Sequence, residues 1–246
     1  MERHQYKNPP IKEAVFEFRF TAEADEGDPT IPGRLYAEIR DTYSAKPREK
    51  SFLRLEPNGE FHPEPRVIFS TADGSSLLVV GRDLLSVNAL QPYQGWPTFR
   101  ERIAGALDTY KHAAQPKGVK RVGVRYINRI LIPKESMTPE RYLNGVSAEV
   151  DGLPKSRVEL LSRVKYRYDD GTQLIVTHSF DTEQKDKVGI LLDLDLAWIA
   201  ADDEQREIEK LMPIVDKLRD RERSAFESLI TDEARALFDD DPMATE

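Results

Sequence analysis

The longest strand candidate in the chain is VKRVGVRYINRILI, from Val119 to Ile132. Apolar and basic side chains alternate along it, the period-2 pattern of a strand with one buried face. The inward set is Val122, Val124, Tyr126, Ile130 and Ile132, and the outward set is Arg121, Arg125 and Arg129. Asn128 falls on the inward side, so its amide needs a partner inside the protein. It either fixes the strand register or belongs to a polar pocket.

The segments on both sides of this strand follow the same order of elements. The first, 13–115, predicts a strand, a helix, several strands and a long helix. The second, 119–230, predicts a strand, a short helix, further strands and a long helix. The two segments match in element order and not in their residues.

We therefore predict an α+β fold with a long, mostly antiparallel, curved sheet and two long helices on one face. The element order suggests a duplicated β-α-β-β-β-α unit, saddle-like as in the TATA-box-binding protein. The alternative is a helix-grip fold, in which the sheet curls around the last helix. Contact between the helices at 99–110 and 208–218 would favour the saddle.

The boundaries of the elements follow from periodicity and from turn residues. The predicted strands are 13–20, 51–55, 66–71, 76–80, 84–90, 119–132, 157–168, 172–180 and 188–198. The predicted helices are 32–47, 95–114, 138–145 and 203–229. Pro213 should kink or interrupt the last helix. His62 falls in a proline-rich stretch that predicts a surface loop.

The chain of 246 residues is predicted to be a single domain with pseudo-halves 13–115 and 119–230. Residues 1–12 form an N-terminal arm, and residues 239–246 form an acidic tail. Residues 202–246 carry 15 acidic and 7 basic side chains, so the net charge of −8 belongs to this end and residues 1–201 are neutral overall. An acidic total therefore does not argue against an anionic ligand elsewhere.

The chain contains no cysteine, which excludes disulfides, thiolate metal sites and cysteine nucleophiles. The N-terminus has no apolar stretch of a secretory signal, and the apolar runs are too short for a membrane span. These features predict a cytoplasmic protein that does not enter a membrane.

Sequence motifs for catalysis are missing as well. The chain has no phosphate-binding glycine loop, nucleophile elbow or zinc-protease helix, and its four histidines are scattered. We therefore predict no catalytic residue, no metal ligand and no cofactor. His178 alternates with Leu174, Val176 and Phe180, which predicts a packed core histidine.

A second basic set lies on the strand predicted at 157–168. Alternation places Arg163, Lys165 and Arg167 on the face opposite Val158, Leu160, Val164, Tyr166 and Tyr168. With Arg121, Arg125 and Arg129, six basic side chains then project from the non-core face, together with Asp193 and Asp195 if the strands share a sheet. Two interpretations remain open. The six are paired with carboxylates across strands, or they form a basic surface that binds an anionic ligand, a nucleic-acid backbone or an acidic partner.

Four segments resemble a sporadically distributed bacterial protein family of about 250 residues. They are NPPIKEAVFE (8–17), GWPTF (95–99), RYINRI (125–130) and AFESLIT (225–231). The resemblance implies no assigned catalytic residues. The scattered distribution implies an association with defence or toxin–antitoxin genes.

The first functional hypothesis is a non-catalytic binding or interaction protein, as an accessory or neutralising member of a defence or toxin–antitoxin pair. The second is binding of nucleic acid or an anionic ligand by the six basic residues. The third is an enzyme whose carboxylate–arginine site is not visible in the sequence. The partner is a protein in the first case, and the sequence does not indicate the oligomeric state.

Overall fold

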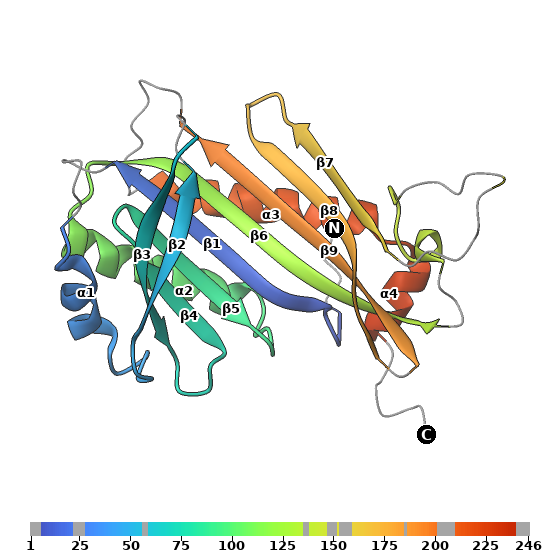
Figure 1. Cartoon of the computed structure of the whole chain (residues 1–246), viewed down its shortest axis with the longest axis horizontal. Helices are drawn as coiled ribbons and strands as arrows, with labels where there is room; N and C mark the ends of the chain where they lie inside the picture. The colour runs from blue at the N-terminus through green and yellow to red at the C-terminus, as the bar shows by residue number, and fades with distance from the viewer. Residues whose placement is uncertain are drawn as a thin grey trace. The chain divides into compact units, whose positions relative to one another are not determined.

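A computed structural model of the chain describes residues 6–21, 28–55, 59–134, 138–146, 152, 159–184, 186–200 and 210–239. In this part of the chain, nine strands form one open antiparallel sheet in the order β2-β3-β4-β5-β1-β6-β9-β8-β7 (Figure 1). The α+β class and the antiparallel sheet are therefore confirmed.

The strands and helices have the following bounds. The strands are β1 (Ile11–Thr21), β2 (Arg48–Leu55), β3 (Phe61–Ser70), β4 (Ser76–Val80), β5 (Leu84–Leu90), β6 (Gly118–Pro133), β7 (Leu161–Arg167), β8 (Gln173–Gln184) and β9 (Lys187–Ile199). The helices are α1 (Ile31–Ile39), α2 (Trp96–Ala114), α3 (Leu211–Leu229) and α4 (Asp232–Asp239), with a short 3-10 helix at Pro139–Arg141. None of the described helices is long and apolar enough to cross a membrane.

The chain divides into two compact units, each built from separate segments. The first unit comprises 13–124 and 197–218, and the second comprises 1–12, 125–196 and 219–246. The predicted pseudo-half 13–115 lies inside the first unit, whereas 119–230 is distributed over both.

Aromatic side chains join the helices of the first unit to its strands. Phe16 and Phe20 lie on the buried face of β1, where alternate residues are almost fully buried. The ring of Phe16 is 5.9 Å from that of Phe99 on α2, and Phe20 stacks on Tyr110 at 4.5 Å. These contacts show that the apolar stripe of the amphipathic helix α2 faces β1.

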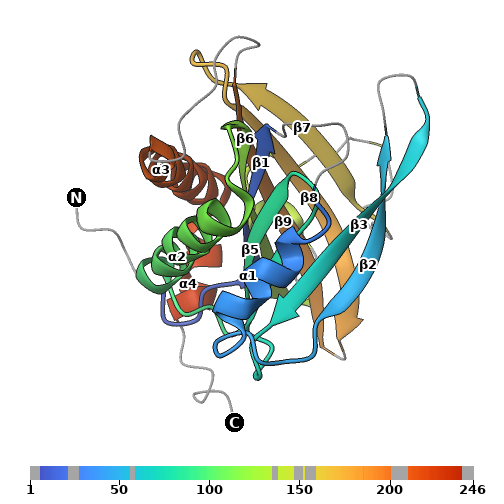
Figure 2. The ribbon, with the colours of Figure 1, turned by 90° about the vertical axis from the view of Figure 1, so that its left-hand side faces the viewer.

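The short helix α1 covers the same face. Its Tyr36 stacks on Phe69 of β3 at 5.4 Å. The strand register places Phe69 opposite Leu78, Leu78 opposite Val87, and Val87 opposite Phe16. Because directly paired residues share a face, α1 and α2 pack side by side on one face of these strands (Figure 2).

One predicted loop is wrong. Residues 61–65, including His62, belong to β3, which pairs with β2 from Phe61 onward. The prolines at 63 and 65 suggested a loop because proline cannot donate to a strand ladder. They are tolerated because β4 pairs only with Val67–Ser70, so this end of β3 has a neighbour on one side alone.

The predicted end of the last long helix is confirmed, but a further helix that was not predicted follows it. The helix ends at Leu229, and a separate helix α4 begins at Asp232. The hydroxyl oxygen of Thr231 accepts a hydrogen bond from the backbone N–H of Ala234 at 3.3 Å, which is the contact of an N-cap. Pro213 lies in the first turn of α3, where proline is tolerated. Residues 203–209 of the predicted helix lie outside the described residues.

Candidate functional site

The three arginines of β6 are each paired with a carboxylate. Arg121 contacts Glu17 at 2.9 Å within the first unit. Within the second unit, Arg125 makes two hydrogen bonds to Asp193, at 2.9 and 2.6 Å, and Arg129 contacts Asp181 at 2.6 Å. For these three residues the counter-charge is internal, as the cross-strand interpretation predicted.

The three basic residues of β7 are arranged differently. Arg163, Lys165 and Arg167 are exposed, and no described carboxylate forms an ion pair with any of them. We call them the β7 cations. Among the described residues, three of the six predicted binding residues are therefore paired with a carboxylate, and the three β7 cations are not.

Two residues of the apolar face predicted for β7 are exposed, whereas Leu160, just before the strand, is buried. The exposed fraction is 41% for Val164 and 51% for Tyr166, although these residues pair directly with the buried Val176 and Leu174 of β8. The reason is the strand order, because β7 is the last strand of the sheet in the described part of the chain. Leu161, at the start of the strand, is 72% exposed.

A groove of about 370 Å³ lies between this end of the sheet and α3. Its walls come from β7, from the residues that follow it, from β8 and from α3. They are Tyr166, Arg167, Tyr168, Leu174, Val176, Ala225, Ser228 and Leu229. Volumes of this size and a mainly apolar lining are typical of ligand and side-chain pockets. We call this space the β7–α3 groove.

The ring of Tyr168 in this groove is held by Arg221 of α3. The guanidinium carbon of Arg221 lies 4.3 Å from the ring centroid, and the same side chain pairs with Asp170 at 2.9 Å. This arrangement fixes one wall of the β7–α3 groove.

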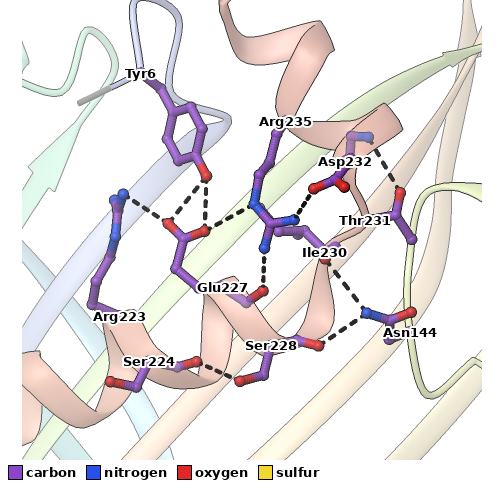
Figure 3. Close-up of polar contacts among 11 residues, drawn as sticks. Tyr6, Asn144, Arg223, Ser224, Glu227, Ser228, Ile230, Thr231, Asp232 and Arg235 are labelled. Atoms are coloured by element: carbon purple, nitrogen blue, oxygen red, sulfur yellow. Dashed lines mark hydrogen bonds and ion pairs between the residues drawn. The ribbon is translucent and has the colours of Figure 1, made fainter. Parts of the chain in front are cut away.

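A polar cluster around Glu227 joins the N-terminal arm to α3 and α4 (Figure 3). The hydroxyl of Tyr6 donates to the two carboxylate oxygens of Glu227 at 2.9 and 3.1 Å. Arg223 and Arg235 contact the same carboxylate at 2.7 and 3.2 Å. Burial, with the hydrogen bond to Glu227, raises the pKa of Tyr6 to about 12. The cluster therefore ties three separate segments together.

Hydrogen bonds between side chains and backbone carbonyls connect this cluster to the segment before β7. The side-chain amide of Asn144 donates to the carbonyl oxygens of Ser228 and Ile230, at 3.1 and 3.4 Å (Figure 3). The hydroxyl of Thr231 donates to the carbonyl of Arg141 at 2.7 Å. These bonds hold the end of α3, and with it the α3 wall of the β7–α3 groove.

A buried ion pair lies on α3, about one turn before Glu227. Arg219 and Glu222 are hydrogen-bonded to each other, and their exposed fractions are 8% and 2%. The guanidinium carbon of Arg219 also lies 4.7 Å from the ring centroid of Tyr126. Burial raises the pKa of Glu222 to about 7, although Arg219 and Arg223 oppose the rise.

Asn128 lies beside this ion pair. Its amide donates to the carbonyl of Leu192 at 3.2 Å, so it joins β6 to β9. It also lines a cavity of about 20 Å³ next to Arg219 and Glu222. That volume is enough for about one water molecule. Asn128 therefore has both of the roles that the sequence left open.

His178 is buried, as predicted. Its exposed fraction is 2%, and burial lowers the pKa of its imidazole. Neither ring nitrogen has a hydrogen-bond partner among the described residues. Asp193 and Asp195 are half-buried and alternate with the buried leucines of β9. The described residues contain no cluster of three or more side chains suited to a metal ion.

Residues 8–12, 125–130 and 225–231, from three of the four segments that carry the family resemblance, meet in the second unit. The backbone N–H of Arg129 donates to the carbonyl of Pro10 at 2.7 Å. Pro9, Tyr126 and Phe226 line the same small cavity. The fourth segment, GWPTF, begins α2 in the first unit.

Sequence reasoning missed the charged residues of α3. Arg219, Glu222 and Arg223 follow Val215 and Leu218 on the apolar stripe at spacings of three and four residues. Charges at such positions must be paired when they are buried. This spacing was the signal in the sequence.

Comparisons with known proteins add little. No family model and no curated protein matches the chain. Among solved structures, the crystal structure of the di-domain ARO/CYC StfQ from the steffimycin biosynthetic pathway aligns over 92% of this chain and 97% of that one. The identity is 8% and the TM-score is 0.19, which is too low to support an argument about fold or function.

Proposed function

We propose that this chain is a binding protein that takes up an extended, acidic segment of a partner protein along the outer edge of β7, which has no strand neighbour among the described residues. The observation that carries the proposal is that β7, the last strand of the described sheet, presents three cations without a described carboxylate partner. A terminal strand offers unpaired backbone N–H and C=O groups to an incoming strand. The β7 cations add complementarity to acidic side chains at every second position of that strand.

The simplest alternative is that the β7 cations only protect the edge. Lysines on terminal strands prevent aggregation in many proteins. A protective edge does not need exposed apolar residues, and β7 exposes Leu161, Val164 and Tyr166 as well. The combination of cations and exposed apolar residues on β7 favours an edge that a partner covers.

A second copy of this chain is a poor partner for β7. In every register that keeps the cations of both copies on one face of the sheet, antiparallel pairing of two β7 strands would place Arg163, Lys165 and Arg167 against the same cations of the other copy. Like charges directly opposite each other destabilise a strand pair. Charge complementarity therefore selects a different, acidic chain.

The other terminal strand, β2, is less suited to this role. It contains Glu49 between Arg48 and Lys50, whereas β7 contains no acidic residue. A pattern of mixed charge gives less attraction for an acidic strand.

The proposal includes the duplicated, saddle-like arrangement and a place in a bacterial defence or toxin–antitoxin pair. The first is supported by the bidentate contact of Arg100 on α2 with Asp216 on α3, at 2.7 and 2.9 Å within the first unit. A saddle requires such a contact between the two long helices, and a helix-grip fold does not. The place in a bacterial defence or toxin–antitoxin pair is supported by the family resemblance alone.

Charge reversal on β7 tests the proposal. The probe is a fluorescent acetyl-Glu-Ser-Glu-Ser-Glu-Ser-Glu-amide peptide, measured by anisotropy at several salt concentrations. We expect the double variant Arg163→Glu with Lys165→Glu to weaken binding at least about tenfold, because two ion pairs become repulsions. The salt dependence should decrease at the same time.

The matched control is the double variant Arg48→Glu with Lys50→Glu, which changes two exposed cations at the same spacing on β2. It should bind the peptide like the wild type. Equal weakening by both variants would show a general effect of net charge and contradict the proposal. Binding of single-stranded oligothymidylate in preference to the peptide would show a polyanion site instead.

A further inference from the structure

The β7–α3 groove lies on the side of β7 that carries Val164 and Tyr166, and Arg167 at the end of the strand lines it as well. Val164 and Tyr166 pair with Val176 and Leu174, so all four side chains share the face that α3 covers. Arg163 and Lys165 alternate with Val164 and Tyr166, do not line the groove and belong to the other face. A strand added to β7 would therefore present its side chains alternately to the cations and to the side of the groove.

We infer that the β7–α3 groove binds large apolar side chains of the partner segment, so that the partner is a strand in which acidic and apolar residues alternate. This inference rests on the proposed function and specifies the partner's sequence. The acidic residues contact the β7 cations, and the intervening apolar residues enter the groove. The occupant is an acidic, foreign chain for the reasons of charge given above.

The composition of the groove supports an apolar occupant. Leu174, Val176 and Leu229 contribute aliphatic walls, and Tyr166 and Tyr168 contribute aromatic ones. Ala225 and Ser228 are small residues on α3, which leaves space between the helix and the strands. Relative to the roughly 30 Å³ that one water takes up in the liquid, a volume of about 370 Å³ accommodates more than one large side chain.

Exposure of the strand indicates where the occupant enters. Tyr166 is 51% exposed and Val164 is 41% exposed on a face that is buried one strand further in. Covering apolar surface of this kind stabilises a complex in proportion to the area removed from water. A strand beside β7 would cover both residues and complete the wall of the groove.

The test compares two peptides of equal charge. One is the acetyl-Glu-Ser-Glu-Ser-Glu-Ser-Glu-amide peptide, and the other replaces each serine with leucine. We expect leucine to raise the affinity for the wild type about tenfold to a hundredfold, since each buried leucine removes apolar surface from water. A lysine–leucine peptide of the same length should not bind, which excludes non-specific apolar adsorption.

Two variants fill the groove from α3, Ala225→Phe and Ser228→Phe. Both variants should bind the leucine peptide no more tightly than the serine peptide. Their affinity for the serine peptide should equal that of the wild type. Ser224→Phe is the control, because Ser224 is exposed on the same helix and does not line the groove. Ser228 is exposed as well, so its variant should fold even if Ala225→Phe does not.

The outcomes separate the two claims. If the serine and leucine peptides bind the wild type equally, the groove has no part in recognition and the inference is overturned, while the proposed function stands. The inference is also overturned, and the proposed function again stands, if both groove-filling variants still bind the leucine peptide more tightly than the serine peptide to the same degree as the wild type. If neither peptide binds, the proposed function is overturned and the inference falls with it.

Discussion

Replacing Arg219 with methionine should lower the free energy of unfolding by about 3–5 kcal/mol at pH 8. Arg219 is the partner of Glu222, and both side chains are buried. Without the guanidinium, the carboxylate of Glu222 remains in a low-dielectric environment with no bonded counter-charge. Urea unfolding followed by circular dichroism measures the loss.

The double variant Arg219→Met with Glu222→Leu distinguishes the loss of a partner from the loss of packing. Replacing a buried ion pair by apolar residues of similar size is often neutral or stabilising. We therefore expect the double variant to recover most of the stability. A double variant as unstable as Arg219→Met would mean that the contact of Arg219 with Tyr126 matters more than its pairing with Glu222.

Stability should fall between pH 4.5 and pH 7 because of Glu222. Burial raises the pKa of this carboxyl from 4.5 to about 7, so in that range the folded state holds a proton that the unfolded state has released. The stabilisation is complete below pH 4.5 and is lost as the pH rises through 7. At about 1.4 kcal/mol per pKa unit, the total is about 3 kcal/mol.

The comparison that isolates this effect is Glu222→Gln, which keeps the shape of the side chain and cannot titrate. The difference in unfolding free energy between this variant and the wild type should change by about 3 kcal/mol from pH 4.5 to pH 8. Glu101→Gln, at an exposed position on α2, is the matched control. A constant difference for Glu222→Gln across this range would contradict the prediction.

The sequence predicted strand type and strand parity well where one face is buried along its whole length. On β6, every second residue from Val122 to Ile132 is buried, and all of these except Asn128 are apolar, so the alternation in the sequence is strong. The outward direction of Arg125 and the inward direction of Asn128 followed from it. Pro63 and Pro65 led to the wrong prediction of a loop. Proline is tolerated in a strand where no neighbouring strand needs its missing N–H group, and the sequence does not show which neighbours a strand has.

The candidate site could be predicted only in part, because strand order is not a local property. Arg125 and Lys165 carry the same alternation signal, yet one has Asp193 beside it and the other lies at the end of the sheet. No periodicity distinguishes these two situations. The buried position of Glu222 likewise depends on how α3 packs, and only its spacing from Leu218 hinted at it.

Amide hydrogen exchange of β7, with and without the glutamate–leucine peptide, tests the central claim most directly. In the free protein, the N–H groups on the outer edge of β7 have no strand partner in the described part of the chain. We expect the peptide to slow exchange at alternate residues of Leu161–Arg167, because an added strand accepts hydrogen bonds from that edge alone. Unchanged exchange along β7 when the peptide is bound would contradict it.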